Sequence, residues 1–314
     1  MPNSFDPLLP PADDLLAAWA RRVRENREQV ERYAEQASGP DHYAPVAARF
    51  RADPRRTDEP ALDALRSLVR PDETWLDIGA GGGRYALPLA LVARRVIALD
   101  PSDGMLDVLR AGMDEHGIRN VSIVPGRWPA VAKLLGRPDD RRAGAADTAL
   151  GAGTALDTDA QPAADVAFIA HVGYDVEEIG PFLDAMERAA RRCVALLFWR
   201  RPTWAADALW PAVHGVERAA LPALRELLAV LLARGRTFEI REILNEPMTY
   251  ESVDGALALA RHQTWVRQDS EKDRLLQHAL AERLIERAGR YAFDWSPAPL
   301  GIVTWAAPGA EHTP

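Results

Sequence analysis

The chain is poor in the residues that build several common kinds of site. It contains a single cysteine, Cys193, among 314 residues. One thiol cannot form an internal disulfide or the thiolate cluster of a zinc or iron–sulfur centre. Cys193 opens the apolar run 193–199, where an inert buried thiol is expected. We therefore predict no disulfide framework and no metal site.

Long apolar runs are also missing. No stretch reaches the roughly 20 apolar residues that a helix needs to span a membrane. Residues 1–7 contain no basic segment followed by an apolar one, which argues against a secretion signal. The apolar fraction of 47% is ordinary for a soluble protein. We predict a cytoplasmic protein with no membrane partner.

Lysine is scarce, and the positive charge comes almost entirely from arginine. The formal net charge is −8, and Lys133 and Lys272 are the only lysines. Acidic and basic residues are mixed along the chain, without the basic stripe that is typical of nucleic-acid-binding proteins. We therefore expect a small-molecule partner and consider nucleic acid an improbable one. Whether the protein is a monomer or a homodimer stays open.

A glycine-rich turn between a strand and a helix is the most informative feature present. Residues 74–78 predict a buried strand, and Gly79, Gly81 and Gly83 follow at once. Helical spacing of apolar residues begins at Tyr85. This order brings bare backbone N–H groups and the positive end of a helix close to an anionic ligand group. Glycine is needed where a side chain would block that approach or where φ is positive.

The spacing of the glycines distinguishes two nucleotide-binding patterns. The dinucleotide fingerprint G-x-G-x-x-G fails, because its third glycine would fall on Arg84 when counted from Gly79. The pattern present is D-x-G-x-G-x-G, starting at Asp77, and the next strand, within residues 96–106, ends in Asp-Pro-Ser. Together these features resemble motif I and the following strand of class I S-adenosylmethionine-dependent methyltransferases, of the small-molecule kind grouped as types 11 and 25.

The resemblance implies S-adenosylmethionine as the cofactor. Asp77 and the glycine loop would hold its amino-acid end, and Asp100 would accept both ribose hydroxyls, since a carboxylate offers two oxygens to a vicinal diol. Ser102 can cap the next helix, which leaves Asp100 for that role. Tyr43 would reach the methionine end, or would only dock its segment on the core. The predicted cofactor-binding residues are Tyr43, Asp77, Gly79, Ala80, Gly81, Gly83, Asp100, Pro101, Met105, Arg127, Trp128 and His171.

The predicted adenine contact departs from the family's pattern. Many relatives carry an acid just after the glycine of motif III, whereas Arg127 and Trp128 stand there in this chain. Backbone groups could still bond the adenine edge while Trp128 or Met105 packs on its face. Packing of Trp128 in the core is the alternative.

Two candidate catalytic residues, His171 and Tyr174, follow the fourth predicted strand, where relatives place groups near the transferring methyl. His171 is a candidate general base, because imidazole titrates near neutral pH. It could instead bond a backbone carbonyl near the methionine moiety. A base is not obligatory, since in-line displacement at a sulfonium depends mostly on proximity and alignment.

Helices alternate with short apolar strands through most of the chain, which predicts right-handed βαβ units and a parallel sheet. The fold class is α/β, and the resemblance implies a Rossmann-like, mostly parallel seven-stranded sheet in the order 3-2-1-4-5-7-6 with helices on both faces. We expect an N-terminal helical cap in residues 1–60 and a cofactor-binding core in residues 61–200. Residues 201–314 would supply helical lid segments and strands six and seven. Residues 133–164 hold almost no large apolar side chain and predict a flexible insertion.

The expected function is methyl transfer from S-adenosylmethionine to a small molecule by in-line displacement, with release of S-adenosylhomocysteine. An RNA or protein methyltransferase and a non-catalytic module that binds either form of the cofactor are the alternatives. A dehydrogenase is the least compatible class, given the failed glycine count. Trp204, Trp210, Trp265 and Trp295 could line an apolar acceptor pocket or belong to the core. The acceptor atom is not identifiable from the sequence.

Overall fold

The structure, a computed structural model, describes most of the chain. The described residues are 9–36, 41–57, 59–135, 162–199, 207–245, 248–293 and 298–309. Most of the predicted insertion 133–164 lies outside them, and so do Trp204 and Trp295.

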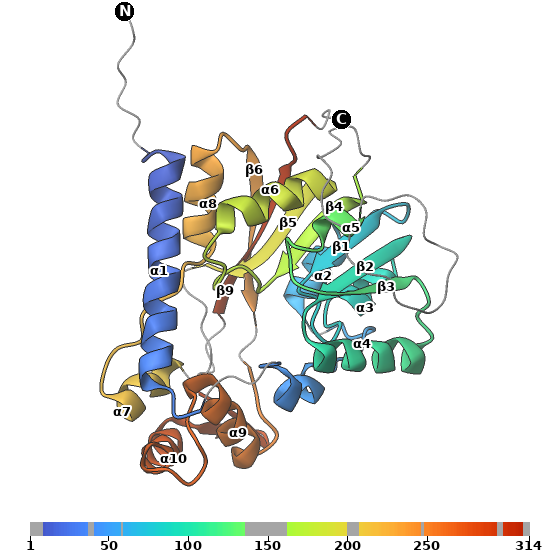
Figure 1. The fold of residues 1–314 in the computed structure, drawn as a ribbon. Coiled ribbons are helices and arrows are strands. Elements are labelled where there is room, and N and C mark those ends of the chain that lie inside the picture. Colours follow the sequence, from blue (N-terminus) through green and yellow to red (C-terminus); the bar gives the residue numbers. More distant parts are fainter. Residues whose placement is uncertain are drawn as a thin grey trace, which may run out of the picture.

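A seven-stranded sheet organises the chain (Figure 1). Its strands are β1 (Thr74–Ile78), β2 (Arg95–Asp100), β3 (Val121–Pro125), β4 (Ala164–Ala170), β5 (Ala190–Phe198), β6 (Phe238–Asn245) and β9 (Ala298–Ala306). Their spatial order is β3-β2-β1-β4-β5-β9-β6, and β9 alone among them runs antiparallel to its neighbours. The predicted order is therefore confirmed, with β9 as the seventh strand.

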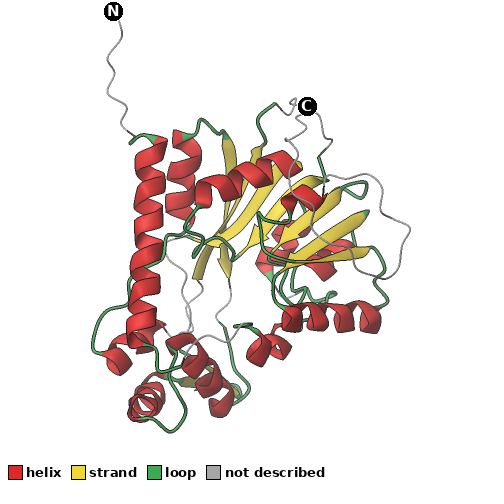
Figure 2. Ribbon diagram, in the orientation of Figure 1, coloured by secondary structure: helices red, strands yellow, loops and turns green. Residues whose placement is uncertain are grey.

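Helices cover both faces of the sheet, as Figure 2 shows. One face carries α1 (Ala12–Tyr33), α5 (Ala132–Leu135), α6 (Ile179–Ala189) and α8 (Leu224–Ala233), and the other carries α2 (Pro60–Arg66), α3 (Ala86–Ala90) and α4 (Asp103–His116). Successive residues of a strand point to opposite faces. Leu76 accordingly packs in the first core and Trp75 in the second. Burial on both faces explains why the strands are continuously apolar.

A second group of helices has its own core, and we call residues 207–214 and 248–293 the cap. It contains η2 (Asp207–Leu209), α7 (Trp210–His214), α9 (Val253–Thr264) and α10 (Glu271–Arg283). Its interior is built from residues such as Leu209, Ala256 and Leu276. The predicted domain boundaries at residues 60 and 200 stay predictions.

The sequence predicts a helical region over residues 252–288, and a small hairpin at the end of the cap corrects this prediction. β7 (Ile285–Arg287) pairs antiparallel with β8 (Arg290–Ala292). The two residues between them, Ala288 and Gly289, have φ of 49° and 75°. Positive φ at both central residues makes a turn whose twist matches a hairpin, so the helix ends before it.

N-terminal segments connect the cap to the rest of the molecule. In Figure 1, α1 runs from beside α8 down to the cap, and the short helix η1 (Ala44–Phe50) lies between the cap and α4. The N–H of Glu35 donates to the carbonyl of Trp265 at 2.9 Å. Arg49 donates to the carbonyl of Gly255 at 2.8 Å. The cap is therefore held next to the segment that precedes the glycine loop in the sequence.

Three compositional features can be located in the described part of the chain. Cys193 is buried in β5, and burial raises the pKa of its thiol, as expected for an inert side chain. No described helix has both the length and the apolar character needed to cross a membrane. The same residues contain no group of three or more His, Cys, Asp or Glu side chains arranged to hold a metal ion.

Candidate cofactor and acceptor site

Three glycines of the loop after β1 have positive φ, and one of them, Gly81, leaves room for a ligand beside the backbone. Gly79, Gly81 and Gly83 have φ of 76°, 53° and 86°, which a side chain would strain. A Cβ at Gly79 or Gly83 would also lie 2.5 Å from a neighbouring side-chain carbon, that of Val172 in the case of Gly79. At Gly81 the nearest atom is the sulfur of the buried Met105, 3.8 Å away. Gly81 is therefore the position at which a ligand can approach the backbone.

Several N–H groups of this loop are used within the protein. Those of Gly79, Ala80 and Gly83 donate to backbone carbonyls at 2.7 to 3.0 Å, and that of Gly81 donates to the carboxylate of Asp100 at 2.8 Å. The helix that follows, α3, has only five residues. This differs from the expectation that these N–H groups and a helix end would meet an anionic ligand group. What the loop provides is backbone without side chains, against which a ligand can lie closely.

Asp100 ends β2 with its carboxylate turned toward the glycine loop. Oδ2 accepts from the N–H of Gly81 at 2.8 Å, and Oδ1 accepts from the N–H of Ser102 at 2.9 Å. The hydroxyl oxygen of Ser102 accepts from the N–H of Met105 at 3.1 Å, so Ser102 caps α4 as predicted. Each carboxylate oxygen has two acceptor positions. Asp100 therefore keeps one acceptor position on each oxygen for a vicinal diol.

Two acidic side chains on neighbouring strands give the site its electrostatic character. Asp77 on β1 is 2% exposed, and burial, with the charge of Asp100 adding to it, raises its pKa to about 8. Burial also raises the pKa of Asp100, against hydrogen bonds from Ser102 and Gly81 that lower it. Buried like charges disfavour the doubly ionised state unless a cation is present. The pair therefore suits a cationic ligand group such as an ammonium.

Asp41, which was not among the predicted site residues, fastens the segment before the glycine loop to α4. Its Oδ2 accepts from the hydroxyl of Ser102 at 2.8 Å and from the N–H of Gly104 at 3.2 Å. Its Oδ1 accepts from the N–H groups of Tyr43 and Ala44, both at 3.1 Å. Desolvation raises the pKa of Asp41, but these bonds outweigh it and keep the pKa below its usual value. An aspartate that bonds backbone N–H groups two and three residues ahead is a recognisable turn signal.

Tyr43 lies near Asp100, at the carboxyl ends of β1 and β2, and we call this part of the molecule the rim. Its ring packs edge-on against Phe50, with centroids 6.1 Å apart, and is 45% exposed. Desolvation raises the pKa of its hydroxyl to about 12, with the charges of Asp175 and Asp100 adding to the effect. Tyr43 thus docks its segment on the protein and also stands within electrostatic reach of the proposed ribose ligand.

The other side chains predicted around the adenine lie in different environments. Trp128 is buried, and its indole N–H donates to the carbonyl of Phe182 at 3.2 Å. Of the two alternatives for Trp128, the structure thus gives core packing. Arg127 is exposed, and its charge acts to lower the pKa of Asp100. Pro101 is exposed at the end of β2.

His171 and Tyr174 form a pair at the ends of β4 and β5. Nδ1 of His171 lies 3.3 Å from the hydroxyl of Tyr174, which accepts from the N–H of Phe198 at 2.8 Å. Burial, with the charge of Arg84 adding to it, lowers the pKa of His171 to about 4. Burial raises the pKa of Tyr174. His171 is therefore a neutral imidazole at neutral pH, and the un-ionised Tyr174 fixes its ring.

A buried ionic group supports the residue that follows the glycine loop. The hydroxyl of Tyr85 donates to the carboxylate of Glu59 at 2.9 Å. Arg56 and Arg84 pair with the same carboxylate at 2.7 and 3.0 Å. The ring of Tyr85 lies 6.4 Å from that of His171. No sequence pattern pointed to this group, because its members come from separate segments.

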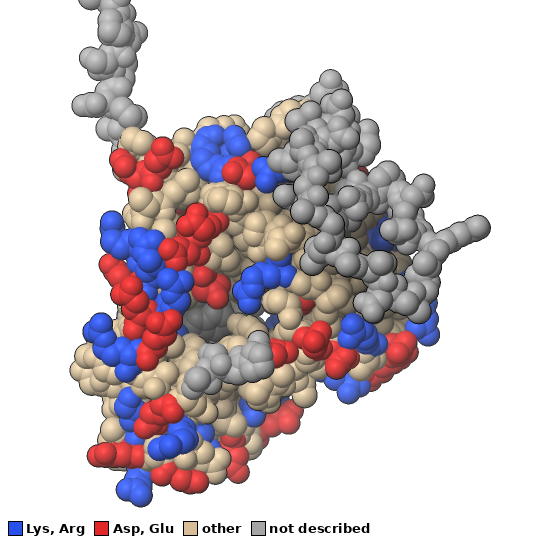
Figure 3. All heavy atoms as spheres, viewed as in Figure 1, with Lys and Arg blue, Asp and Glu red and all other residues tan. Residues whose placement is uncertain are grey.

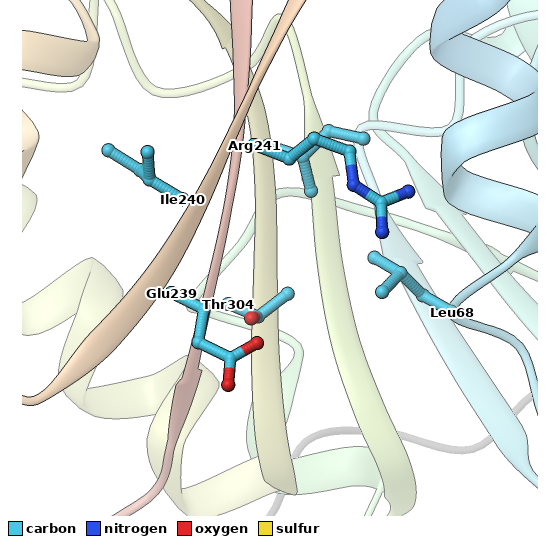
Figure 4. Close-up of a pocket in the computed structure, with 6 residues that line it drawn as sticks. Leu68, Glu239, Ile240, Arg241 and Thr304 are labelled. Atoms are coloured by element: carbon cyan, nitrogen blue, oxygen red, sulfur yellow. The ribbon is translucent and has the colours of Figure 1, made fainter.

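A shallow pocket of about 160 Å³ lies elsewhere, at the β6 edge of the sheet (Figure 4). Glu239 and Arg241 of β6 point to the side of Leu68, and Ile240 points away from it. The lining residues are Leu68, Glu239, Ile240, Arg241, Ile302 and Thr304. None of these is a predicted site residue, so this pocket is separate from the rim described above.

The comparisons with known proteins agree with this fold. Residues 76–128 match the model of a family described as a methyltransferase domain. The matched stretch runs from β1 past β3 and contains the glycine loop and Asp100. The resemblance to class I methyltransferases is confirmed by this match and by the strand order.

Similar proteins include one curated sequence and several solved structures. An uncharacterized protein from Haemophilus influenzae is 37% identical over 83 residues, which span 26% of this chain and only 30% of that relative. The YcgJ protein from Bacillus subtilis is similar with a TM-score of 0.49 and 14% identity, covering 79% of this chain and 99% of the other. A SAM dependent methyltransferase from Aquifex aeolicus has a TM-score of 0.41 and 13% identity, covering 89% and 97%.

Proposed function

From the class I S-adenosylmethionine-dependent methyltransferase core of this chain, we propose that the protein transfers a methyl group from S-adenosylmethionine to a small-molecule acceptor. The observation that carries the proposal is the relation of Gly81 to Asp100. A side-chain carbon at Gly81 would meet only the sulfur of Met105, at 3.8 Å, and the N–H of Gly81 holds the Asp100 carboxylate at 2.8 Å. A carboxylate at the edge of a bare turn can bind a sugar diol while the backbone lies against the ligand.

The residues at the rim fit the proposed cofactor. Asp77 would face its ammonium, Asp100 its ribose hydroxyls, and Gly81 would allow the ligand to lie against the backbone. S-adenosylmethionine, when bound, supplies an electrophilic methyl group on a sulfonium. Asp77 and Asp100 are not both ionised readily unless a cation lies beside them. The ammonium group of the cofactor would be that cation.

Transfer requires no further cofactor. A lone pair of the acceptor would form the new bond to the methyl carbon as the carbon–sulfur bond breaks, and the bonding pair would stay on sulfur, which gives S-adenosylhomocysteine. A proton on the acceptor atom leaves to water or to the neutral imidazole of His171. With a pKa of about 4, His171 holds that proton only briefly, so alignment contributes more than basicity. Tyr174 positions the imidazole.

The charge distribution favours a small acceptor over a nucleic acid. Acidic and basic side chains are interspersed over the described atoms of the face seen in Figure 3, with no continuous basic stripe. Asp41, Asp77, Asp100 and Asp175 surround the rim. A phosphate backbone approaching this rim would be repelled by the ionised acids, and Arg127 next to Asp100 offsets only part of that charge.

An assay of labelled methyl transfer separates the proposal from its alternatives. S-adenosylmethionine carrying a labelled methyl group is incubated with phenols, amines and thiols, with bulk tRNA and with a mixed protein substrate. The proposal predicts label in a low-molecular-weight product and equimolar S-adenosylhomocysteine. Label in tRNA or protein would support the macromolecular alternative. Tight cofactor binding without turnover on any acceptor would support the non-catalytic alternative.

A further inference from the structure

A stack of aromatic rings joins the rim to the cap. The imidazole of His42 lies 4.2 Å from that of His262 on α9, with 25° between the ring planes. The same His42 ring lies 5.6 Å from Trp265, nearly parallel at 14°. Tyr43 closes the group, with its centroid 5.1 Å from His42 and 6.5 Å from His262. Residues from distant parts of the sequence thus form one flat-sided cluster.

His262 carries an unsatisfied polar atom within this cluster. Its Nε2 is buried and has no hydrogen-bond partner among the described residues. Buried polar atoms in native proteins nearly always have a partner, so such an exception indicates a missing ligand or water. Burial, with the charges of His42 and Arg49 adding to it, lowers the pKa of His262 to about 4. The ring is therefore neutral, and Nε2 is a donor or an acceptor according to its tautomer.

One ring of the cluster is open to solvent. Tyr43 is 45% exposed, whereas His42, His262 and Trp265 are half-buried. The cluster is built from two parts of the molecule, because His42 and Tyr43 come from the segment before η1 and His262 and Trp265 come from the cap. Tyr43 is therefore the most accessible ring at the boundary of these two parts.

The hydrogen bonds of Asp41 place the cluster next to the cofactor rim. Asp41 precedes His42 and binds Ser102, whose own N–H donates to Asp100. The path from Asp100, the proposed ribose ligand, to the stacked rings therefore runs through two residues, Ser102 and Asp41. Trp265, at the end of α9, has φ of 54°, so the helix ends at the residue whose ring lies against His42.

We propose that His42, Tyr43 and His262 form the wall that binds the methyl acceptor, and that the acceptor is a flat aromatic molecule with a hydroxyl group that hydrogen-bonds to Nε2 of His262. This inference rests on the proposed function. Offset and edge-on contacts with imidazole and phenol rings favour a planar ligand over a saturated one. A hydroxyl both donates and accepts, so it can pair with either tautomer of His262. The charges of Asp100 and Asp175 disfavour an anionic acceptor.

Three small probes test the proposal on the full chain saturated with S-adenosylhomocysteine. Isothermal titration compares 5-hydroxyindole, indole and cyclohexanol. We expect 5-hydroxyindole to bind roughly ten times more tightly than indole, as one added hydrogen bond allows, and cyclohexanol to bind weakest. Equal affinity for 5-hydroxyindole and cyclohexanol, or binding of none of the three, would overturn the proposal without any variant being needed.

Substitutions then assign the contacts. His262→Phe keeps a flat ring but removes Nε2, so 5-hydroxyindole should bind no better than indole, with S-adenosylhomocysteine affinity unchanged. His42→Ala should weaken both indoles about equally. His278→Phe, on the exposed surface of α10, is the matched control and should change nothing. Retention of the full preference for 5-hydroxyindole in His262→Phe would contradict the assignment.

The proposed function and the acceptor wall fail in different ways. If the wild-type chain does not bind S-adenosylhomocysteine, the proposed function itself is wrong. If it binds the cofactor product but does not distinguish the three probes, only the acceptor wall is wrong.

Discussion

The hydroxyl of Ser102 donates to the carboxylate of Asp41 at 2.8 Å, across 61 residues of sequence. This bond joins the N-terminus of α4, beside Asp100, to the segment that carries His42 and Tyr43. Since η1 also contacts the cap through Arg49, the bond couples the cofactor rim to the acceptor side of the molecule. The position of Tyr43 relative to Asp100 thus depends on a residue that touches neither ligand.

Replacement of this carboxylate should weaken cofactor binding indirectly. Asp41→Ala removes four hydrogen bonds, so we expect S-adenosylhomocysteine affinity to fall about tenfold and the free energy of unfolding to fall by about 1–3 kcal/mol. Titration calorimetry and urea unfolding measure the two effects. Asp107→Ala, which replaces an exposed acid of α4, is the control. An Asp41→Ala variant with wild-type affinity would show that the segment is held by other contacts.

Glycines of the loop after β1 should differ in what their replacement does, since one substitution should reduce stability and the other should reduce ligand binding. Gly83→Ala combines strained φ with a carbon 2.5 Å from Leu109, so we expect a loss of more than about 2 kcal/mol in stability. Gly81→Ala meets no such contact and should cost only about 1–2 kcal/mol of strain, yet it should abolish ligand binding. Thermal unfolding and titration of the same two variants check both halves. Equal ligand affinity in folded Gly81→Ala and wild type would remove the proposed approach path.

The raised pKa of Asp77 predicts that cofactor binding releases a proton. At pH 7 the free carboxyl, with a pKa of about 8, is mostly protonated, and a bound ammonium favours the ionised form. Affinity should therefore rise roughly tenfold from pH 6 to pH 7.5. Titrations in phosphate and in Tris, whose ionisation enthalpies differ, would report the released proton. Asp77→Asn should bind more weakly and lose the pH dependence, whereas the same slope in this variant would assign the proton to another group.

Buried neutral histidines should make the protein sensitive to mild acid. Burial lowers the pKa of His171, of His214 and of His262 to about 4 in each case, below the usual 6.5. The unfolded chain then binds more protons between pH 4 and 6.5, so this stabilisation is complete above pH 6.5 and is lost as pH falls. Asp77 has the opposite effect on the free energy of unfolding. Its folded-state pKa is raised, so between pH 3.8 and 8 the folded chain binds the extra proton, and falling pH then stabilises the fold. The free energies of unfolding in urea at pH 7 and pH 5 should differ by a few kcal/mol, because a one-unit difference between the folded and unfolded pKa of a group corresponds to about 1.4 kcal/mol. No loss at pH 5 would mean that these rings are solvated.

The order of the sheet was predictable only through the resemblance to class I methyltransferases, whereas the place of the rim was predictable because local patterns encode it. The strand before Gly79 and the strand ending in Asp100 are short apolar runs with sharp ends, and parallel strands bring their carboxyl ends to one edge. Ser102 was predictable as a cap from its position alone. These features depend on neighbours within a few residues.

The acceptor side was not predictable, because its contacts join residues that are far apart in the sequence. His42 and His262 meet only because α1 and η1 hold the cap beside the rim, and nothing near either histidine in the sequence indicates the other. The internal use of the glycine-loop N–H groups likewise depends on the carbonyl of Leu99 in the neighbouring strand. The segment after Arg283 was predicted as helical although it forms a hairpin. Its residues are charged, and its turn, Ala288-Gly289, lacks the stronger Asn-Gly signal.

The most direct test of the account is a calorimetric titration of S-adenosylhomocysteine into the wild-type chain, Asp100→Ala and the control Asp107→Ala. We expect micromolar binding to the wild type and the control, and a loss of at least about a hundredfold in Asp100→Ala, because both ribose hydroxyls lose their acceptor. Binding of NAD in place of S-adenosylhomocysteine, or equal affinity in Asp100→Ala and the wild type, would contradict it.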